Sequence, residues 1–243
     1  FGTLALTGSN VAVTENAAMD LGASTIGGTA NFNSTSNVIT DSGTLAITGA
    51  TTINAGTADI TLDQAASTFG ALALTGANVA VTENAATDLA ASTVSGTLGV
   101  TSTGAVTDSG TLAITGATTI SASGQDITLD EAASTFGALA LTGANVAVTE
   151  NAATDLAAST VSGTLGITSA GAVTDSGTLA ITGATTISAS GQDITLDEAA
   201  STFGTLALTG SNVAVTENAA MDLGASTIGG TANFNSTSNV ITD

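Results

Sequence analysis

Apolar and polar residues alternate over short stretches of this chain, and small or turn-forming residues separate the stretches. Gly, Asn, Ser and Asp lie between the stretches, as tight turns require. Alternation with a period of two, in segments rich in Val, Ile and Thr, is typical of β-strands. Between residues 69 and 135 it predicts strands at 71–76, 78–83, 87–92, 97–102, 104–109, 111–116, 118–123, 126–131 and 132–137.

The same passage returns along the chain, each time beginning at a phenylalanine. The second and third copies differ only at Val100 against Ile167 and at Thr103 against Ala170, and the last copy reproduces the start of the first. Because the chain begins with Phe1 rather than Met, we expect a window cut from a longer array. The repeats are residues 1–68, 69–135, 136–202 and the partial repeat 203–243.

Nine short strands in 67 residues correspond to three coils of about 22 residues, each with three strands. This arithmetic predicts an all-β fold, a right-handed parallel β-helix or β-solenoid, because parallel crossovers are right-handed. We expect residues 1–243 to form one continuous solenoid of about eleven coils. A β-propeller or β-sandwich is the alternative, but propeller blades carry aromatic signatures and this chain has only six Phe.

The inward positions of the predicted strands are apolar and would form the core of the stack. Burying each such side chain contributes about 1.5–3 kcal/mol before the entropy of ordering. Phe32 and Phe234 occupy the position of Val100 and are also expected inside. The absence of Pro agrees with this arrangement, since every interior amide must donate to the ladder. Further core residues are Val79, Val81, Val106, Ile127 and Leu129.

The composition excludes several kinds of function. The chain has no Lys, Arg, His or Cys, and its 20 acidic residues give a formal net charge of −20. It therefore lacks the cations that face phosphates, so we expect no nucleic-acid partner. It also lacks the commonest general base, thiolate nucleophiles and Cys-type zinc sites, so we expect no enzyme. Apolar runs are too short for a transmembrane helix, and no membrane insertion is expected in this segment.

The passages GQDITLD, FGALALTGANVAVTE and TDLAASTVSGTL resemble the β-strand repeats of filamentous-haemagglutinin-like large exoproteins, and the resemblance covers the whole chain. It implies right-handed parallel β-helix shafts, secretion, and surface fibres or adhesins. No match to that family's secretion domain or to a binding head is present, so no functional residue is carried over.

The carboxylates are the only chemically reactive charged groups, and they recur at equivalent places. Aligning the second strand of each predicted coil places an acid two positions after the last inward residue, which predicts a column of acids at one corner. Oxygen-rich columns suit a hard cation such as Ca²⁺. The competing interpretation is solvated acids that keep the protein soluble. The proposed cation column consists of Glu83, Asp108, Glu131, Glu150, Asp175 and Glu198.

Two other functions are weaker hypotheses. Carboxylate pairs serve glycosidases, but this pattern is copied in every repeat, whereas an active site is usually singular. Threonine rows suggest ice binding, but Thr103 is replaced by Ala170 in the next repeat, and β-propensity explains the threonines as well.

The sequence predicts a structural shaft of a giant secreted or cell-surface protein, building an extracellular filament, sheath or adhesin stalk. It would self-associate end to end or laterally into fibres and require no cofactor. The alternative is an adhesive module that recognises a glycan or itself through a lateral face, with Ca²⁺ as an optional cofactor.

Overall fold

The computed structural model describes residues 1–238 and 240–243. The chain divides into two compact units, Phe1–Ala122 (unit 1) and Ser123–Asp243 (unit 2). Every strand pair with a resolved register is parallel, and the described residues form no helix. The predicted all-β parallel solenoid is confirmed, while its handedness and the continuity of the two units stay predictions.

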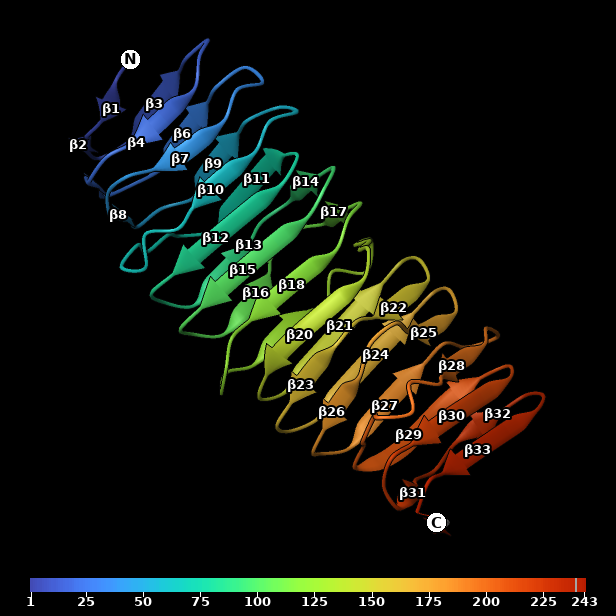
Figure 1. Cartoon of the computed structure of the whole chain (residues 1–243). Helices are drawn as coiled ribbons and strands as arrows, with labels where there is room; N and C mark the ends of the chain where they lie inside the picture. Colours follow the sequence, from blue (N-terminus) through green and yellow to red (C-terminus); the bar gives the residue numbers. More distant parts are fainter. Residues whose placement is uncertain (239) are drawn as a thin grey trace. The chain divides into compact units, whose positions relative to one another are not determined.

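Unit 1 consists of a first sheet, a second sheet and a short third sheet, whose strands stack in successive turns (Figure 1). The first sheet contains β1 (Thr3–Leu4), β4 (Met19–Leu21), β7 (Ile39–Asp41), β10 (Ile60–Leu62), β12 (Val79–Glu83), β15 (Leu98–Ser102) and β18 (Thr118–Ser121). The second contains β3 (Val11–Thr14), β6 (Ala30–Asn33), β9 (Thr51–Asn54), β11 (Leu72–Gly76), β13 (Thr87–Leu89), β14 (Ser92–Val94), β16 (Val106–Asp108) and β17 (Leu112–Ile114). The third contains β2 (Thr7–Gly8), β5 (Ser24–Ile26) and β8 (Leu45–Ile47).

Unit 2 likewise has a first and a second sheet of stacked parallel strands. The first contains β20 (Leu139–Gly143), β22 (Thr154–Leu156), β23 (Ser159–Val161), β25 (Val173–Asp175), β26 (Leu179–Ile181), β28 (Ile194–Leu196), β30 (Val213–Glu217) and β33 (Ala232–Ser236). The second contains β19 (Ile127–Leu129), β21 (Val146–Glu150), β24 (Leu165–Ser169), β27 (Thr185–Ser188), β29 (Thr205–Gly210), β31 (Met221–Leu223), β32 (Thr227–Ile228) and β34 (Ile241–Thr242).

The strand predictions were largely right for residues 69–135. Eight of the nine predicted segments contain a strand, and the ninth, 132–137, consists of a turn and a single bridge residue. The strand Ser92–Val94 was missed, because the prediction ended one strand at residue 92 and placed none after it. Several turns have three short strands, as predicted; β4, β5 and β6 are an example.

The turns are shorter than predicted. Asn78 and Thr97, which are joined by a hydrogen bond from one turn to the next, lie only nineteen residues apart in the sequence. The register pair Val79↔Leu98 has the same offset. Other pairs on neighbouring turns have a different separation in the sequence: it is smaller for Leu72 and Leu89 and larger for Thr51 and Leu72. The first sheet has seven consecutive turns in unit 1 and six in unit 2, which gives about thirteen rather than eleven.

Because the turns are this short, one repeat contains three whole turns and about half of a fourth. Equivalent strands therefore change sheets from one repeat to the next. In unit 1, Val11–Thr14 lies in the second sheet and its copy Val79–Glu83 in the first. In unit 2, Val146–Glu150 lies in the second sheet and its copy Val213–Glu217 in the first.

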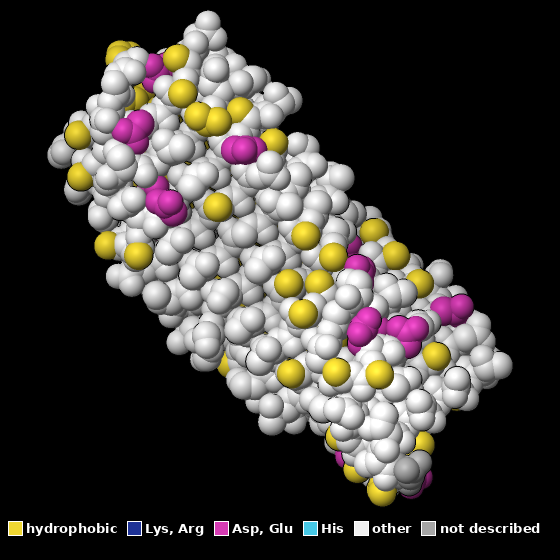
Figure 2. All heavy atoms as spheres, viewed as in Figure 1, with side chains coloured by type: hydrophobic (Ala, Val, Ile, Leu, Met, Phe, Trp, Pro, Cys, Tyr) yellow, Lys and Arg dark blue, Asp and Glu magenta, His cyan; other side chains and the backbone are white. Residues whose placement is uncertain are grey.

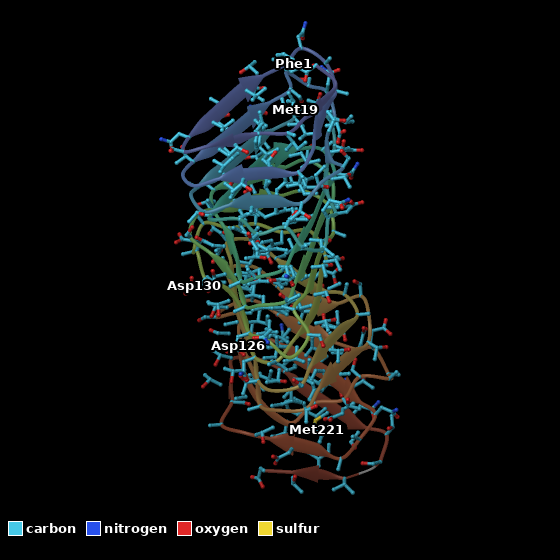
Figure 3. The ribbon with its side chains drawn as sticks, turned by 90° about the vertical axis from the view of Figure 1, so that its left-hand side faces the viewer. Phe1, Met19, Asp126, Asp130 and Met221 are labelled. Carbon is cyan, nitrogen blue, oxygen red and sulfur yellow. The ribbon has the colours of Figure 1, made fainter. Side chains whose placement is uncertain are left out.

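The core lies between the sheets of each unit and is filled by the inward residues of the strands. The five predicted core residues, Val79, Val81, Val106, Ile127 and Leu129, are at most 2% exposed, and Phe32 is fully buried. Phe234 lies in β33 and is half-buried. Figure 3 shows Met19 and Met221 among the interior side chains of their units, in agreement with their burial.

Glycines make the tight corners possible. A Cβ on Gly116 would lie 2.5 Å from the carbonyl oxygen of Gly96 in the turn before it, far inside van der Waals contact. A Cβ on Gly99, which lies in β15, would meet nothing closer than 3.9 Å. Only glycine allows two backbones to come this close at a corner. Corners of this kind are short, which explains why each turn of the solenoid has fewer residues than predicted.

This contrast gives a matched pair of variants in unit 1. We expect Gly116→Ala to lower the free energy of unfolding by about 1–3 kcal/mol, because the backbone of Gly96 must move. Gly99→Ala should be neutral or stabilise by up to about 1 kcal/mol, because it restricts the unfolded chain without a clash. Urea unfolding of both variants measures the difference, and equal values would contradict the explanation for the short turns.

Candidate functional site: the buried carboxylates

The acidic side chains are the natural place to look for chemistry. No pocket that would hold a ligand is found in the described part of the chain. Figure 2 shows a face made mostly of backbone and small polar side chains, with acids scattered singly or in small groups and no basic residue. Among residues 1–238 and 240–243, no group of three or more acids is placed to hold a metal ion.

The predicted cation column is not formed in either unit. In unit 1, Glu83 ends β12 of the first sheet and pairs with Ser102, whereas Asp108 ends β16 of the second sheet and pairs with Leu89. In unit 2, Glu150 ends a strand of the second sheet and Asp175 ends a strand of the first. The prediction was wrong because it assumed a longer turn.

The remaining two members of the predicted column lie outside the strands. Glu131 and Glu198 follow β19 and β28 in turns, and the backbone N–H of Glu198 donates to Asp175 Oδ2 over 3.3 Å. Asp108 and Glu131 also have interactions of their own. The six residues therefore do not form one column, and cation binding by any of them stays a prediction.

The carboxylates instead form two kinds of buried corner. The first joins a glutamate at the end of a VAVTE strand to a phenylalanine fourteen residues before it. Phe69 N–H donates to Glu83 Oε1 over 2.7 Å, and Phe136 and Phe203 donate to Glu150 and Glu217 over 2.8 Å each. In the first copy, the amino terminus of Phe1 forms an ion pair with Glu15. The glutamate thus binds a buried amide through its side chain.

These glutamates are buried without a cationic side chain. Glu83, Glu150 and Glu217 are 1%, 2% and 0% exposed. Burial raises the pKa of all three above the usual range, because removal from water penalises the charged form. The Phe N–H bonds and, for Glu83 and Glu150, the nearby hydroxyls of Thr87 and Thr154 only partly oppose this. The second oxygen, Oε2, is buried without a hydrogen-bond partner in each of them.

The second corner joins an aspartate at the end of a VTD or ITD strand to the next turn. Asp41 Oδ1 accepts a hydrogen bond from Asp63 N–H, and Asp175 Oδ1 accepts one from Asp197 N–H, each over 2.8 Å. Burial raises the pKa of Asp41 and Asp175, and repulsion from the neighbouring acids adds to the effect. Both aspartate side chains are buried.

Exposed acids act differently, as links between turns on the surface. Asp59 Oδ1 accepts from the N–H and the side-chain amide of Asn78, and Asn78 Oδ1 accepts from the N–H and hydroxyl of Thr97. Unit 2 repeats this link with Asp126, Asn145 and Thr164 (Figure 3 labels Asp126). Elsewhere, hydroxyls of Thr3 and Ser42 donate to Asp20, which is half-buried, and lower its pKa.

The buried roles of these acids were not predicted from the sequence. The alternation could have predicted that the glutamate is buried, because Glu83 lies on the same side of its strand as Val79 and Val81. Its partner fourteen residues earlier could not be found, because that contact depends on the length of the turn.

Comparison with known proteins shows a repeat family. The family described as repeats of unknown function (DUF5649) matches residues 8–75, 76–142 and 143–209. These copies have the same period as the repeats read from the sequence and begin seven residues later. No curated protein and no solved structure matches the chain. No helix among the described residues is long and apolar enough to cross a membrane.

Proposed function

We propose that this chain, which belongs to the DUF5649 family of repeats, is a structural shaft in which each repeat extends the parallel ladder of the one before it. One observation carries the proposal: the strands pair across a repeat junction as they do within a repeat. In unit 1, β9 and β11 lie on either side of the junction at residues 68 and 69, and they share four register pairs from Thr51↔Leu72 to Asn54↔Thr75.

The same junction recurs in unit 2. There β27 and β29 lie on either side of the junction at residues 202 and 203, with four register pairs from Thr185↔Leu206 to Ser188↔Thr209. Within a repeat, β24 and β27 also share four pairs. A module that ends in a ladder identical to its interior can be added any number of times, as in other solenoids.

The setting of the shaft belongs to the proposal and rests on the resemblance to filamentous-haemagglutinin-like exoproteins. We place it outside the cell, as part of a filament, sheath or adhesin stalk, where it self-associates end to end or laterally. Open strand edges at the ends of a stack favour such pairing, because their N–H and C=O groups have no partner. A spacer role needs length and regularity rather than a reactive side chain.

Repeat number offers a direct test. We expect arrays of two, three, four and six complete repeats to lengthen by about 17 Å per repeat, since three and a half turns advance about 4.8 Å each. Small-angle scattering and electron microscopy of the purified arrays measure the longest dimension. Windows 1–202 and 8–209 serve as a control, because they differ only in where the repeat begins and should have equal lengths.

A different architecture gives a different dependence on repeat number. If the repeats collapsed into a compact body, the longest dimension would grow far more slowly than the number of repeats. Such a result would contradict the shaft. The test does not depend on the extracellular placement, which would be examined separately by locating the native protein with an antibody on unbroken cells.

A further inference from the structure

Hydrogen bonds link the side chains around the buried Glu150, but one oxygen of its carboxyl group has no hydrogen-bond partner. The Thr154 hydroxyl donates to Ser169 Oγ over 3.0 Å, and the Ser169 hydroxyl donates to the carbonyl of Ala152 over 2.8 Å. A hydroxyl has a single hydrogen to donate, so both are already used. Glu150 Oε1 accepts from Phe136 N–H, but Oε2 is buried with no partner.

An ionised carboxylate does not fit this corner. Both oxygens of a carboxylate only accept hydrogen bonds, and Glu150 Oε2 receives none, because the Thr154 hydroxyl donates to Ser169 instead. The chain has no Lys, Arg or His to neutralise the charge. A buried charge without a partner is strongly unfavourable, and such a group becomes neutral instead. A protonated carboxyl, in contrast, would donate from Oε2 to Thr154 Oγ1, which keeps its capacity to accept.

The corresponding corner in unit 1 has the same members. Glu83 Oε1 accepts from Phe69 N–H, and the Ser102 hydroxyl donates to the carbonyl of Ala85 over 2.7 Å. Glu83 Oε2 and Thr87 Oγ1 are both buried and both lack a partner. One hydrogen bond between them would satisfy both atoms, with either as the donor. In this corner, the burial of Glu83 without a cationic side chain is what favours the neutral acid.

We propose that Glu150 and Glu83 are neutral carboxylic acids in the folded chain, each donating from Oε2 to the hydroxyl of Thr154 or Thr87, so that folding takes up two protons. Around Glu150, the hydrogen bonds then run without a gap from the Phe136 N–H through the carboxyl, Thr154 and Ser169 to the carbonyl of Ala152. These two corners make the shaft sensitive to pH without any histidine.

No other charged group explains the arrangement. Against β12, the neighbouring strands β10 and β15 carry no titratable residue, Asp88 on β13 binds the Ser109 hydroxyl, and Asp63 lies in the turn after β10. Against β21, β24 carries none, Asp155 on β22 binds the Ser176 hydroxyl, and Asp130 and Glu131 follow β19. All of these groups are acidic, so they oppose a second negative charge.

The first and last copies supply a natural comparison. Their glutamates, Glu15 and Glu217, have methionine four residues later where Glu83 and Glu150 have threonine. Met221 is fully buried and offers no oxygen to a carboxyl donor. A threonine that can accept a hydrogen bond from the carboxyl is therefore confined to the two central copies.

The test is a pH titration of the intact chain labelled with ¹³C at the glutamate carboxyl. Six glutamates give six signals, which are assigned by single Glu→Gln substitutions. We expect the Glu83 and Glu150 signals to keep the position of the neutral acid over a pH range in which the glutamate of an unfolded reference peptide has already ionised. If Glu83 and Glu150 ionise together with the reference peptide, the proposal is overturned.

Stability gives a second, independent measurement. The double substitution Glu83→Gln and Glu150→Gln imitates the neutral acid, because the amide donates to the threonine and its carbonyl accepts from the Phe N–H. Its stability relative to the native chain should increase as the pH rises, since only the native chain then loses its protons. Glu198→Gln is the control for the substitution itself, because Gln64 already occupies this position in the first repeat, and the effect of the double substitution should change with pH more steeply. A flat effect of the double substitution would contradict the proposal.

Discussion

Thermal unfolding of this chain is expected to move to higher temperature as the pH is lowered from 7 toward 5, the reverse of ordinary acid denaturation. Burial raises the pKa of Asp41, Glu83, Glu150, Asp175 and Glu217 in the folded state. A group with a raised folded pKa contributes stability that is fully present below its unfolded pKa and is lost as the pH rises through the folded pKa. All five groups act in this direction.

The opposing contribution is small. Hydroxyl groups lower the pKa of Asp20, which would favour folding at higher pH, but this side chain is still partly open to water. For a chain of this size, each kcal/mol of added stability raises the unfolding midpoint by about 2–4 °C. Scanning calorimetry in steps from pH 7.5 to 5 measures the effect.

A matched pair of substitutions locates the cause. Asp41→Asn removes a buried charge and keeps the oxygen that accepts from Asp63 N–H, so it should raise the midpoint at pH 7 and reduce its dependence on pH. Asp59→Asn removes the same charge from an exposed side chain and keeps the acceptor for Asn78. Its effect should be much smaller. A midpoint that falls on acidification of the native chain would refute the role given to the buried acids.

The sequence was sufficient to predict the fold class and most of the core. Alternation with a period of two places Val79 and Val81 on one side of a strand whatever the length of the turn, and both are buried. The passage that begins at Phe69 returns at Phe136, and this repetition alone predicts stacked modules. These inferences depend only on the geometry of a single strand and on the sequence repeat, so an error in the length of the turn does not affect them.

The position of residues around the axis could not be predicted in the same way. An error of a few residues per turn accumulates to about half a turn over one repeat, which moves a residue to the opposite sheet. Glu83 and Asp108 were placed in one column for this reason and in fact end strands of different sheets. The missing information is the tightness of corners such as Gly116, where one backbone approaches another.

Dissolved salt should stabilise the folded chain strongly, and this is the second large effect that we expect. Twelve of the 20 acids lie in unit 2, whose first sheet has six consecutive turns. Two acids per turn correspond to about one formal charge per 2.4 Å of axis, when a turn advances about 4.8 Å. Duplex DNA, which gathers counterions, carries one charge per about 1.7 Å.

Repulsion among these acids is stronger in the folded than in the unfolded chain, because folding brings them closer together. Salt weakens it, since the screening length falls from about 30 Å at 0.01 M to about 10 Å at 0.1 M. We therefore expect the unfolding midpoint at pH 7 to rise steadily with NaCl over this range. Calorimetry at fixed pH measures the rise, with sucrose as a control for effects that do not depend on charge.

Exposed and buried acids should contribute unequally to this salt dependence. The triple substitution Asp59→Asn, Asp126→Asn and Asp193→Asn removes exposed charges, so the midpoint should rise less steeply with salt. The triple substitution Glu83→Gln, Glu150→Gln and Glu217→Gln removes the same formal charge from buried positions. If Glu83 and Glu150 are neutral in the folded chain, at most Glu217 has a folded-state charge to remove, and the slope should fall much less than in the first variant. Equal loss of slope in both variants would mean that the buried glutamates are ionised.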